Sequence, residues 1–375
     1  MTLLSQKIIE GIKSEGPINF QTFMETALYH PELGYYMNES LKIGRNGDFY
    51  TSSHMHPFFG AMIGRQLIEM WNIIGKPDEF SVVEMGAGIG YLAKDIIDYL
   101  KSKEIFKSLS YNIIELNSAA KDRQMQLLSE NLNIVTWHNS LKELPPVCGC
   151  FLSNELLDSF PVRLVEINND IYEIFVSVEN QKLVEIKIPC SKEIREYLEE
   201  FAPDLAQESP EVYRTEVSLK IKDWIKGIAS KLMRGFVLTI DYGYPAWQYY
   251  QKDRNLGTLL CYLKHRLSDN PYVNVGHQDI TAHVNFTAFN KWAENSGFAG
   301  VGFCPQGTYL ISLGIDDLIM ELCGDKPDAF DISKVKNLIL PQGMGDTHKV
   351  MIHAKDIAGN YGMRGFMLRN QIGEL

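Results

Sequence analysis

Apolar and polar residues in the first half of the chain recur at spacings typical of alternating strands and helices. Residues 81–83 form a short apolar, β-branched run, and apolar residues then recur at helical spacing over 92–100. A second helical stretch at 118–128 lies among further short apolar runs. These runs are residues 110–115, 133–137 and 148–155. This order predicts a doubly wound α/β fold with a parallel sheet.

The flanking segments predict further elements around that sheet. Residues 1–80 are expected to be mostly helical, with the isoleucines and leucine of the first helix on one face. Beta-type runs separated by polar turns at 168–170 and 179–181 predict an antiparallel insertion over 162–189. Other helices are predicted at 58–74, 194–201, 216–232 and 289–296, and other strands at 235–244, 308–313 and 347–354.

The stretch VVEMGAGIGYL, residues 82–92, carries three glycines at alternate positions between a strand and a helix. Gly86, Gly88 and Gly90 allow positive φ and let a ligand approach the backbone, and the helix start favours an anionic group. A dinucleotide-binding turn reads G-x-G-x-x-G, but here the third glycine comes one position early. Together with Glu84, the pattern resembles the first motif of Rossmann-like S-adenosylmethionine (SAM) methyltransferases. A purely structural turn is the alternative.

The apolar run at 110–115 ends in Glu115, about 25 residues after the glycine turn. An acid at the carboxyl end of the second strand can accept hydrogen bonds from both hydroxyls of a ribose. SAM and NAD both carry such a ribose, so Glu115 predicts a nucleoside-bearing cofactor without choosing between the two. A solvated acid at a strand end is the alternative.

Polar residues also follow the strand predicted at 148–155. The sequence NELLDSFP places Asn154, Glu155 and Asp158 close together beyond it, where ligands bind in open α/β sheets. Methyl transfer depends on holding the donor methyl and the nucleophile in line, and carboxylates there could orient a cationic acceptor such as a guanidinium. The alternative is that Asp158 caps the next helix and Glu155 is solvated.

Composition excludes several classes of protein. The chain has 375 residues, 45% of them hydrophobic, and a formal net charge of -11, which argues against a basic surface that binds nucleic acid. Its six cysteines are scattered and contain no C-x-x-C pair, so neither a disulfide framework nor a metal site is expected. Because no run of about 18 apolar residues occurs, no membrane span is predicted.

These motifs together are similar to those of the MidA family of SAM-dependent methyltransferases, which includes a mitochondrial complex I assembly-factor methyltransferase. The resemblance extends from about Pro17 to Val350. It is carried by HPELGYY, GDFYTSS, VVEMGAGIGYLAKD, NELLDSFPV, IDYGY and GTLLCYLKHRLSDNPYVNVGHQDITAHVNF. Two departures are visible: Ala87 replaces the proline of the family's G-P-G-x-G, and His54 stands where the family's T-S-P-E has its carboxylate.

The resemblance implies a Rossmann-like methyltransferase sheet with an N-terminal helical segment and inserted β and helical segments that cover the substrate. Four segments are expected. They are an N-terminal helical segment with a cofactor-covering loop (1–80), the first half of the core (81–161), a β/helical insertion (162–232), and the second half of the core with a substrate-site loop at 245–290 (233–375). The aromatic, unperiodic stretch 31–57 is predicted to fold over the cofactor, a structural arm being the alternative.

The resemblance also implies site residues and partners. S-adenosyl-L-methionine is the expected cofactor, bound by Glu84, Gly86, Gly88, Gly90, Glu115, Asn154, Asp48 and Thr51. The expected catalytic residues are Glu155, Asp158, Asp279 and His283, although a lone histidine is more often structural. The acceptor would be an arginine of a protein substrate, such as a respiratory-complex subunit.

A bacterial source would place the protein in the cytoplasm, and a eukaryotic source with a removed transit peptide in the mitochondrial matrix. The oligomeric state stays open, a homodimer included. Two other functions remain to be weighed: a non-catalytic assembly factor that retains a SAM-binding fold, and a nicotinamide-dependent oxidoreductase, which the glycine spacing disfavours.

Overall fold

The computed structural model describes residues 1–38, 57–207, 212–264, 266–323, 329–359 and 362–375. Asp48, Thr51 and most of the stretch 31–57 lie outside these residues. Contacts divide the chain into two compact units. The first comprises Met1–Phe49, Leu157–Asp223 and Tyr244–Phe289, and the second comprises Tyr50–Leu156, Trp224–Gly243 and Asn290–Leu375. The four predicted segments stay a prediction of how the chain is organised.

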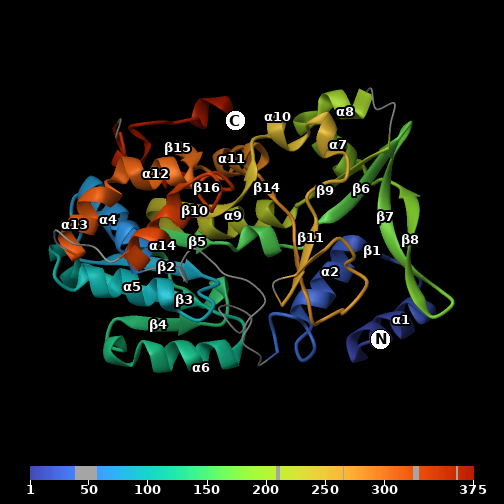
Figure 1. Cartoon of the computed structure of the whole chain (residues 1–375), viewed down its shortest axis with the longest axis horizontal. Helices are drawn as coiled ribbons and strands as arrows, with labels where there is room; N and C mark the ends of the chain where they lie inside the picture. The colour runs from blue at the N-terminus through green and yellow to red at the C-terminus, as the bar shows by residue number, and fades with distance from the viewer. Residues whose placement is uncertain (39–56, 208–211, 265, 324–328, 360–361) are drawn as a thin grey trace. The chain divides into compact units, whose positions relative to one another are not determined.

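The second unit is built on a mainly parallel sheet (Figure 1). Its strand order is β15 (Ala299–Pro305), β16 (His348–Lys355), β10 (Leu232–Tyr244), β5 (Val147–Asn154), β2 (Phe80–Met85), β3 (Leu109–Ile114) and β4 (Val135–His138). β16 runs antiparallel to both of its neighbours, so the other strands of this order point the same way. The predicted doubly wound fold is confirmed.

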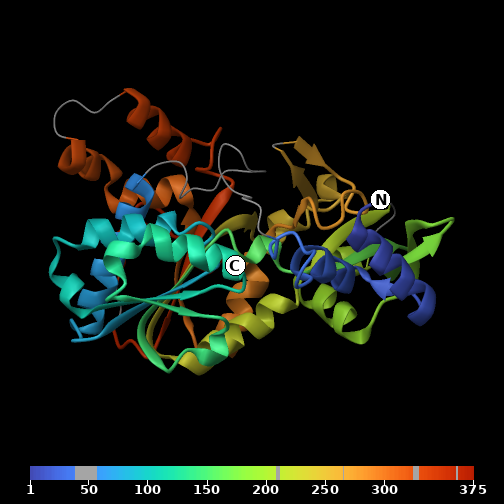
Figure 2. The same ribbon diagram turned by 90° about the horizontal axis from the view of Figure 1, so that it is seen from below.

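Helices lie on both faces of this sheet (Figures 1 and 2). The helices with residues in the second unit are α4 (Pro57–Ile74), α5 (Tyr91–Leu100), α6 (Ser118–Leu127), α9 (Lys220–Lys231), α11 (Phe286–Asn295), α12 (Gln306–Leu313), α13 (Ile315–Cys323) and α14 (Ala329–Ile339). No helix in the described part of the chain is long and apolar enough to cross a membrane.

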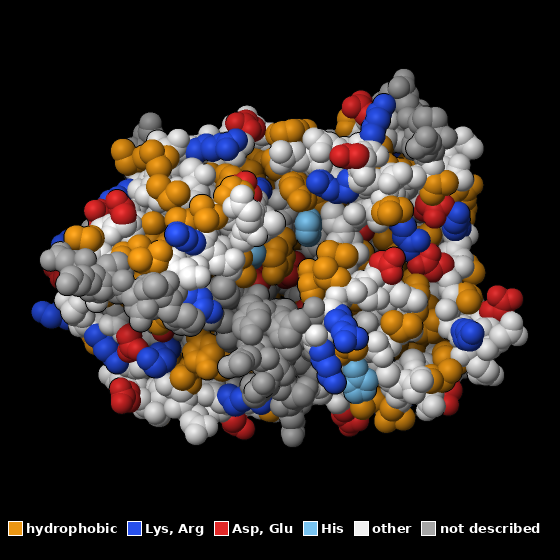
Figure 3. Space-filling view, in the orientation of Figure 1, with side chains coloured by type: hydrophobic (Ala, Val, Ile, Leu, Met, Phe, Trp, Pro, Cys, Tyr) orange, Lys and Arg blue, Asp and Glu red, His pale blue; other side chains and the backbone are white. Residues whose placement is uncertain are grey.

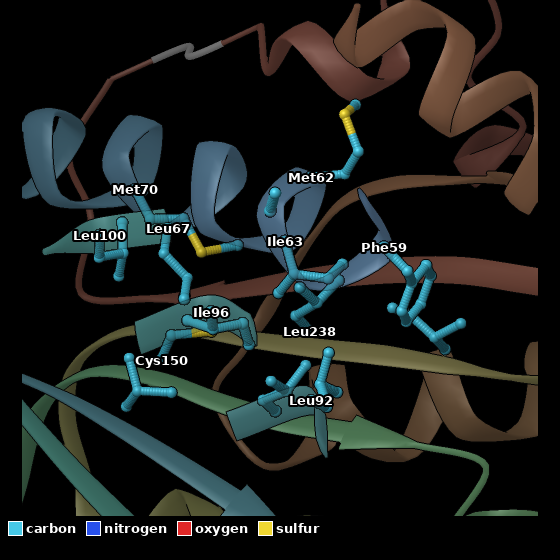
Figure 4. Close-up of a cluster of buried hydrophobic side chains, with 14 of the residues drawn as sticks. Phe59, Met62, Ile63, Leu67, Met70, Leu92, Ile96, Leu100, Cys150 and Leu238 are labelled. Carbon is cyan, nitrogen blue, oxygen red and sulfur yellow. The ribbon is translucent and has the colours of Figure 1, made fainter. Parts of the chain in front are cut away.

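Part of the core of the second unit lies where α4 and α5 pack on the sheet (Figure 4). The labelled side chains are fully or almost fully buried: Phe59, Met62, Ile63, Leu67 and Met70 of α4, Leu92, Ile96 and Leu100 of α5, and Cys150 and Leu238 of the strands. Burying a large apolar side chain is worth roughly 1.5–3 kcal/mol. A Cβ on Gly60 would lie 2.4 Å from Cβ of Asp95, so the helices approach each other closely at that glycine. This contact fixes α5, which begins directly after the glycine turn.

The described part of the first unit contains two small antiparallel sheets. In one, β7 (Asp170–Glu179) pairs with β1 (Ile18–Asn19), β6 (Arg163–Asn168) and β8 (Lys182–Pro189), and β6 also pairs with β9 (Tyr213–Val217). Positive φ at Asn169, Asn180 and Gln181 forms the two tight turns between β6, β7 and β8, as the polar turn residues predicted.

The other sheet of the first unit has the order β12 (Arg266–Ser268), β11 (Leu260–Leu263), β13 (Asp279–Thr281). Two-residue strand β14 (Val284–Asn285) follows β13 along the chain. The helices of this unit are α1 (Leu3–Glu15), α2 (Phe20–Tyr29), α7 (Lys192–Phe201), α8 (Pro203–Gln207) and α10 (Ala246–Tyr249). As predicted, α1 buries Leu4, Ile8, Ile9 and Ile12 on one face.

One predicted element is wrong, and another begins later than predicted. Residues 308–313, read as a strand, belong to helix α12, which buries Tyr309, Leu310 and Leu313 at helical spacing and leaves Ile311 half-exposed. Six residues are too few to separate the two periods. The strand in this part of the chain is instead β15, which precedes α12. Its glycines weaken the apolar pattern by which a strand is recognised in a sequence. A Cβ on Gly302 would lie 2.2 Å from the Phe366 ring, which explains why this strand lacks a side chain there.

The helix predicted over 216–232 begins later than expected. Residues 213–217 form strand β9, in which Glu216 pairs with Leu164 of β6, and helix α9 starts only at Lys220. Strand β9 forms because it pairs with β6, and this tertiary contact outweighs the local helical spacing.

Candidate active site

The candidate site lies where the strand order of the second unit reverses. Within the sheet, β3 and β4 follow one another on one side of β2, whereas β5 and β10 lie on the other side of β2. In open α/β sheets, ligands bind beyond the carboxyl ends of the strands at this point. The glycine turn, Glu84, Glu115 and Asn154 all lie at these strand ends.

The glycine turn has the backbone conformation that its sequence predicts. Gly86, Gly88 and Gly90 have φ of 74°, 57° and 94°, in the left-handed region that favours glycine. The Gly86 N–H donates to the Ile114 carbonyl (3.2 Å), which joins the turn to the end of β3. A Cβ on Gly86 would lie 2.9 Å from Cδ1 of Leu156, so the turn has no space for a side chain at that position.

Glu84 is buried at the end of β2. The Tyr111 hydroxyl donates to its Oε2 over 2.7 Å, and burial raises the pKa of the Glu84 carboxyl from 4.5 to about 7. The carboxyl has little solvent to stabilise its charge, so a cationic ligand group beside it would favour the ionised form.

Glu115 is held by two donors from α6 and the residues before it. The backbone N–H of Asn117 donates to Oε1 (2.9 Å), and Nε2 of Gln124 donates to Oε2 (3.0 Å). The carboxylate keeps capacity for further donors, since each oxygen can accept more than one hydrogen bond. Burial raises the pKa of this partly exposed carboxyl.

Gln124 is a site residue that the sequence did not reveal. Its Nε2 also donates to the Gly88 carbonyl (2.9 Å), and its Oε1 accepts from Nε1 of Trp137 (2.9 Å). The fully buried side chain therefore ties the glycine turn to Glu115. A glutamine in a largely polar helix gave no signal; only its burial separates it from its neighbours.

Asn154 ends β5 next to the glycine turn. Its Nδ2 donates to Oε1 of Glu155 (3.3 Å), whereas its buried Oδ1 has no hydrogen-bond partner among the described residues. A buried acceptor without a donor costs free energy unless a ligand or water supplies one. This atom is thus suited to a ligand that carries hydrogen-bond donors.

Glu155 adopts a backbone conformation that is unusual for a non-glycine residue, with φ of 51°. Its side chain is only 3% exposed. The Tyr242 hydroxyl donates to Oε2 (2.9 Å), and Nε2 of His348 lies 3.6 Å from Oε1. Strained backbone at a strand end, combined with a buried carboxylate, is typical of functional sites. Tyr242 and His348 were not predicted as site residues.

Asp158 and Asp279 lie in the first unit and share a neighbourhood there. The Tyr36 hydroxyl donates to Oδ1 of Asp279 (2.8 Å), and Ala282 N–H donates to the backbone carbonyl of Asp158 (2.9 Å). Burial, followed by the charges of Asp279 and Asp158, raises the pKa of Tyr36. Both carboxyl side chains are buried. The side chain of Glu155 is also only 3% exposed, so the alternative in which Glu155 is solvated is wrong.

His283 also belongs to the first unit. Its backbone N–H donates to the Thr258 hydroxyl (3.0 Å), and its ring lies 5.3 Å from that of Tyr244. Glu155 belongs to the second unit, so the four predicted catalytic residues are distributed over both units. Within the described residues, no group of three or more His, Cys, Asp or Glu side chains could hold a metal ion.

The charged side chains of the described residues show no basic stripe on the face drawn in Figure 3. Acidic and basic side chains are intermixed on the face shown in Figure 3. Such mixing differs from the basic stripe that binds nucleic-acid phosphates.

Comparison with known proteins gives one consistent result. A family described as S-adenosyl-L-methionine-dependent methyltransferases matches residues 62–304. "Protein arginine methyltransferase NDUFAF7, mitochondrial" of Rattus norvegicus is 26% identical over 92% of this chain and 83% of its own length. The Drosophila melanogaster homolog is 27% identical over 82% of this chain and 74% of its own. A Burkholderia thailandensis protein solved with bound S-adenosyl-homocysteine has a TM-score of 0.90 at 29% identity, covering 99% of this chain and 96% of that one.

Proposed function

The chain belongs to the MidA-like family of SAM-dependent methyltransferases, and from this membership we propose that it methylates an arginine side chain of a protein. The observation that carries the arginine assignment is Glu155, a buried carboxylate held in strained backbone at the carboxyl end of β5. The names of the NDUFAF7 relatives support the same acceptor.

SAM is the cofactor, and the residues at the strand ends suit its chemistry. The N–H groups of Gly86 and Gly90 donate to the carbonyls of Ile114 and Ala87, so we assign the other N–H groups of the glycine turn to the carboxylate of its methionine part. Glu84 and Oδ1 of Asn154 are assigned to its ammonium group. The remaining acceptor capacity of Glu115 suits the two ribose hydroxyls. When bound, the cofactor supplies an electrophilic methyl group on a sulfonium. The predicted contributions of Asp48 and Thr51 concern residues outside the described ranges.

Glu155 is assigned the acceptor chemistry. An arginine side chain is protonated in water, so its nitrogen lone pairs are delocalised and weakly nucleophilic. A carboxylate that accepts a hydrogen bond from the attacking nitrogen increases the lone-pair density on that nitrogen and takes up its proton as the new N–C bond forms. Tyr242 and Asn154 donate to Glu155 and hold its carboxylate in one orientation.

Asp158 and Asp279 are proposed as further acceptor-recognition residues. The Tyr36 hydroxyl and the Ile280 N–H both donate to Oδ1 of Asp279 and fix the orientation of this carboxylate, whose charge suits a cationic side chain. The contacts of His283 described above involve its backbone N–H and its ring, both within the first unit. A catalytic role of His283 remains a prediction. A respiratory-complex subunit is the protein acceptor that the family resemblance implies.

The test is transfer of labelled methyl from SAM into proteins of a lysate from the source organism, followed by hydrolysis to amino acids. Label in methylarginine is the expected result. Glu155→Gln should reduce transfer roughly 10²-fold, the usual scale for loss of a positioned base. Exposed Glu130→Gln is the matched control and should behave as wild type.

Three outcomes would contradict the proposal. Label in another residue type removes the arginine assignment. Normal SAM binding without transfer to any protein favours a non-catalytic assembly factor. Full activity of Glu155→Gln removes the proposed role of that carboxylate.

A further inference from the structure

A second buried titratable side chain faces Glu155 from the neighbouring strand. His348 opens β16 opposite Tyr242 of β10, and its side chain is only 2% exposed. Its Nε2 lies 3.6 Å from Oε1 of Glu155 and has no hydrogen-bond partner among the described residues. The nitrogen is therefore placed to exchange a proton with Glu155 after a small approach, to the roughly 2.8 Å of a charge-assisted hydrogen bond.

The other ring nitrogen of His348, Nδ1, contacts a residue that is exposed to solvent. Nδ1 of His348 is 3.1 Å from the hydroxyl oxygen of Thr347, and Thr347 is exposed. When Nδ1 carries the proton and donates it to that hydroxyl, Nε2 presents a lone pair to Glu155. The three residues then form a continuous path from a buried carboxylate to an exposed hydroxyl.

We propose that His348 and Thr347 are the exit path for the proton that methylation releases on Glu155. This inference rests on the proposed role of Glu155, and it extends to any acceptor nitrogen or oxygen that loses a proton. The acceptor N–H bond breaks and an O–H bond forms on Glu155 while the methyl group moves from sulfur to nitrogen. The Glu155 proton then passes to Nε2, and the Nδ1 proton leaves through the Thr347 hydroxyl to water. Glu155 is thereby ionised again and His348 is neutral, with its proton on Nε2. Exchange of that proton for one on Nδ1, through water that reaches the site after product release, restores the starting tautomer for the next turnover.

Exit of the proton matters only after the first turnover, because an ionised Glu155 can accept one proton without help. A defect in the path should leave the first turnover fast and slow the later ones. A residue that only supports the fold would not separate these two rates.

The kinetic test uses methyl-labelled SAM and the acceptor protein isolated from the lysate by its label. First turnovers are measured with enzyme in excess over SAM, and steady-state rates with SAM in excess. His348→Gln should slow the steady state roughly 10²-fold, the lower end for a positioned proton-transfer group, with a burst of one methyl per enzyme. Thr347→Val should slow it several-fold, and Thr347→Ser should restore the wild-type rate. The matched control is Thr136→Val, an exposed threonine of β4.

S-adenosyl-homocysteine titration checks that each variant is folded. Equal steady-state rates for wild type, His348→Gln and Thr347→Val would overturn the exit path while leaving the arginine assignment intact. The reverse case, slowed variants that transfer methyl to a residue other than arginine, would overturn the proposed function and keep the path.

A second measurement needs no acceptor. Nitrogen-15 NMR of histidine-labelled protein, with the His348 signals identified by their loss in His348→Gln, reports which ring nitrogen carries the proton. The path requires the Nδ1–H tautomer in the resting enzyme. An Nε2–H tautomer would overturn it, because Nε2 could then take no proton from Glu155.

Discussion

Burial raises the pKa of two carboxyls, Glu115 in the second unit and Glu216 in the first, but the protein holds them very differently. Glu216 is 2% exposed and accepts from the backbone N–H and the hydroxyl of Thr258, the Leu259 N–H and the Tyr249 hydroxyl. Glu115 is partly exposed, and the hydrogen bonds described above give each of its oxygens one donor. Burial raises the pKa of both carboxyls, so their electrostatics alone do not distinguish them.

The number of protein donors separates the two roles. Glu216 joins strand β9 to the segment around Gly257, where an added Cβ would lie 2.2 Å from its Oε1, and its acceptor capacity is largely used by the protein. Glu115 keeps capacity for a ligand. A buried acid therefore indicates ligand binding only when the protein supplies fewer donors than the oxygens of the acid can accept.

The largest effect is expected for Glu216→Ala. The change leaves two backbone N–H groups and two hydroxyls of Thr258, Leu259 and Tyr249 without their acceptor, and each buried unsatisfied donor costs about 1–3 kcal/mol. We expect the free energy of unfolding to fall by about 3–5 kcal/mol, measured by urea titration with fluorescence detection. Exposed Glu179→Ala is the control. A loss below about 1 kcal/mol would show that the network is not structural.

Glu84 should give the next largest effect, seen as a pH dependence of stability. Its folded-state pKa of about 7 exceeds the ordinary 4.5, so the folded protein binds more protons than the unfolded chain between these values. The contribution of Glu84 to stability therefore falls as pH rises from about 4.5 to 7, by up to roughly 3 kcal/mol at about 1.4 kcal/mol per pKa unit.

Glu84→Gln keeps an acceptor for Tyr111 and removes the titration. Thermal melting from pH 4.5 to 8 should show a flatter profile for this variant and a higher melting temperature near pH 8. Asp95, whose pKa burial raises to about 6, retains part of the slope in both proteins. Parallel profiles for the two proteins would show that Glu84 is not the group responsible.

Glu115→Ala should change binding rather than folding. Loss of its charge-assisted hydrogen bonds to a ribose should weaken S-adenosyl-homocysteine by about 1.5–3 kcal/mol, or roughly 10- to 200-fold in Kd. The ligand-free melting temperature should change little, in contrast to Glu216→Ala. Calorimetric titration measures the affinity. An unchanged Kd in the folded variant would remove Glu115 from the cofactor site.

The sequence predicted best those parts of the site that are local along the chain. A β-branched run, alternating glycines and a helical period meet within residues 81–100, so each reinforces the others. Glu84, Glu115 and Asn154 were placed at strand ends because a residue that closes an apolar run must lie at the end of a strand. The same reasoning placed Glu155 at the last position of the predicted strand 148–155, and in the structure β5 ends one residue earlier, at Asn154.

Contacts between distant segments could not be predicted in this way. His348 reaches Glu155 because β16 pairs antiparallel with β10 in a register that sets His348 opposite Tyr242, and no local pattern encodes that register. Glu216 was assigned to a helix because its strand is specified by pairing with β6. Similarly, Asp279 and Tyr36 lie 243 positions apart, and only the folded first unit joins them.

The smallest effect is expected at Gln124, which acts on the cofactor through Glu115. Gln124→Met preserves length and volume but removes the donors to Oε2 of Glu115 and to the Gly88 carbonyl. The Glu115 carboxylate then loses one of its two restraints, and we expect S-adenosyl-homocysteine to bind about 1 kcal/mol more weakly, the usual worth of one hydrogen bond. The matched control is Gln126→Met, an exposed glutamine of the same helix.

Because Gln124 also accepts from Trp137, Trp137→Phe is measured alongside it to isolate that contact. Affinity equal to wild type in Gln124→Met, or an equal loss in Trp137→Phe, would show that Gln124 does not position Glu115. A loss confined to Gln124→Met, and smaller for an S-adenosyl-homocysteine analogue without ribose hydroxyls, would locate its effect at the ribose.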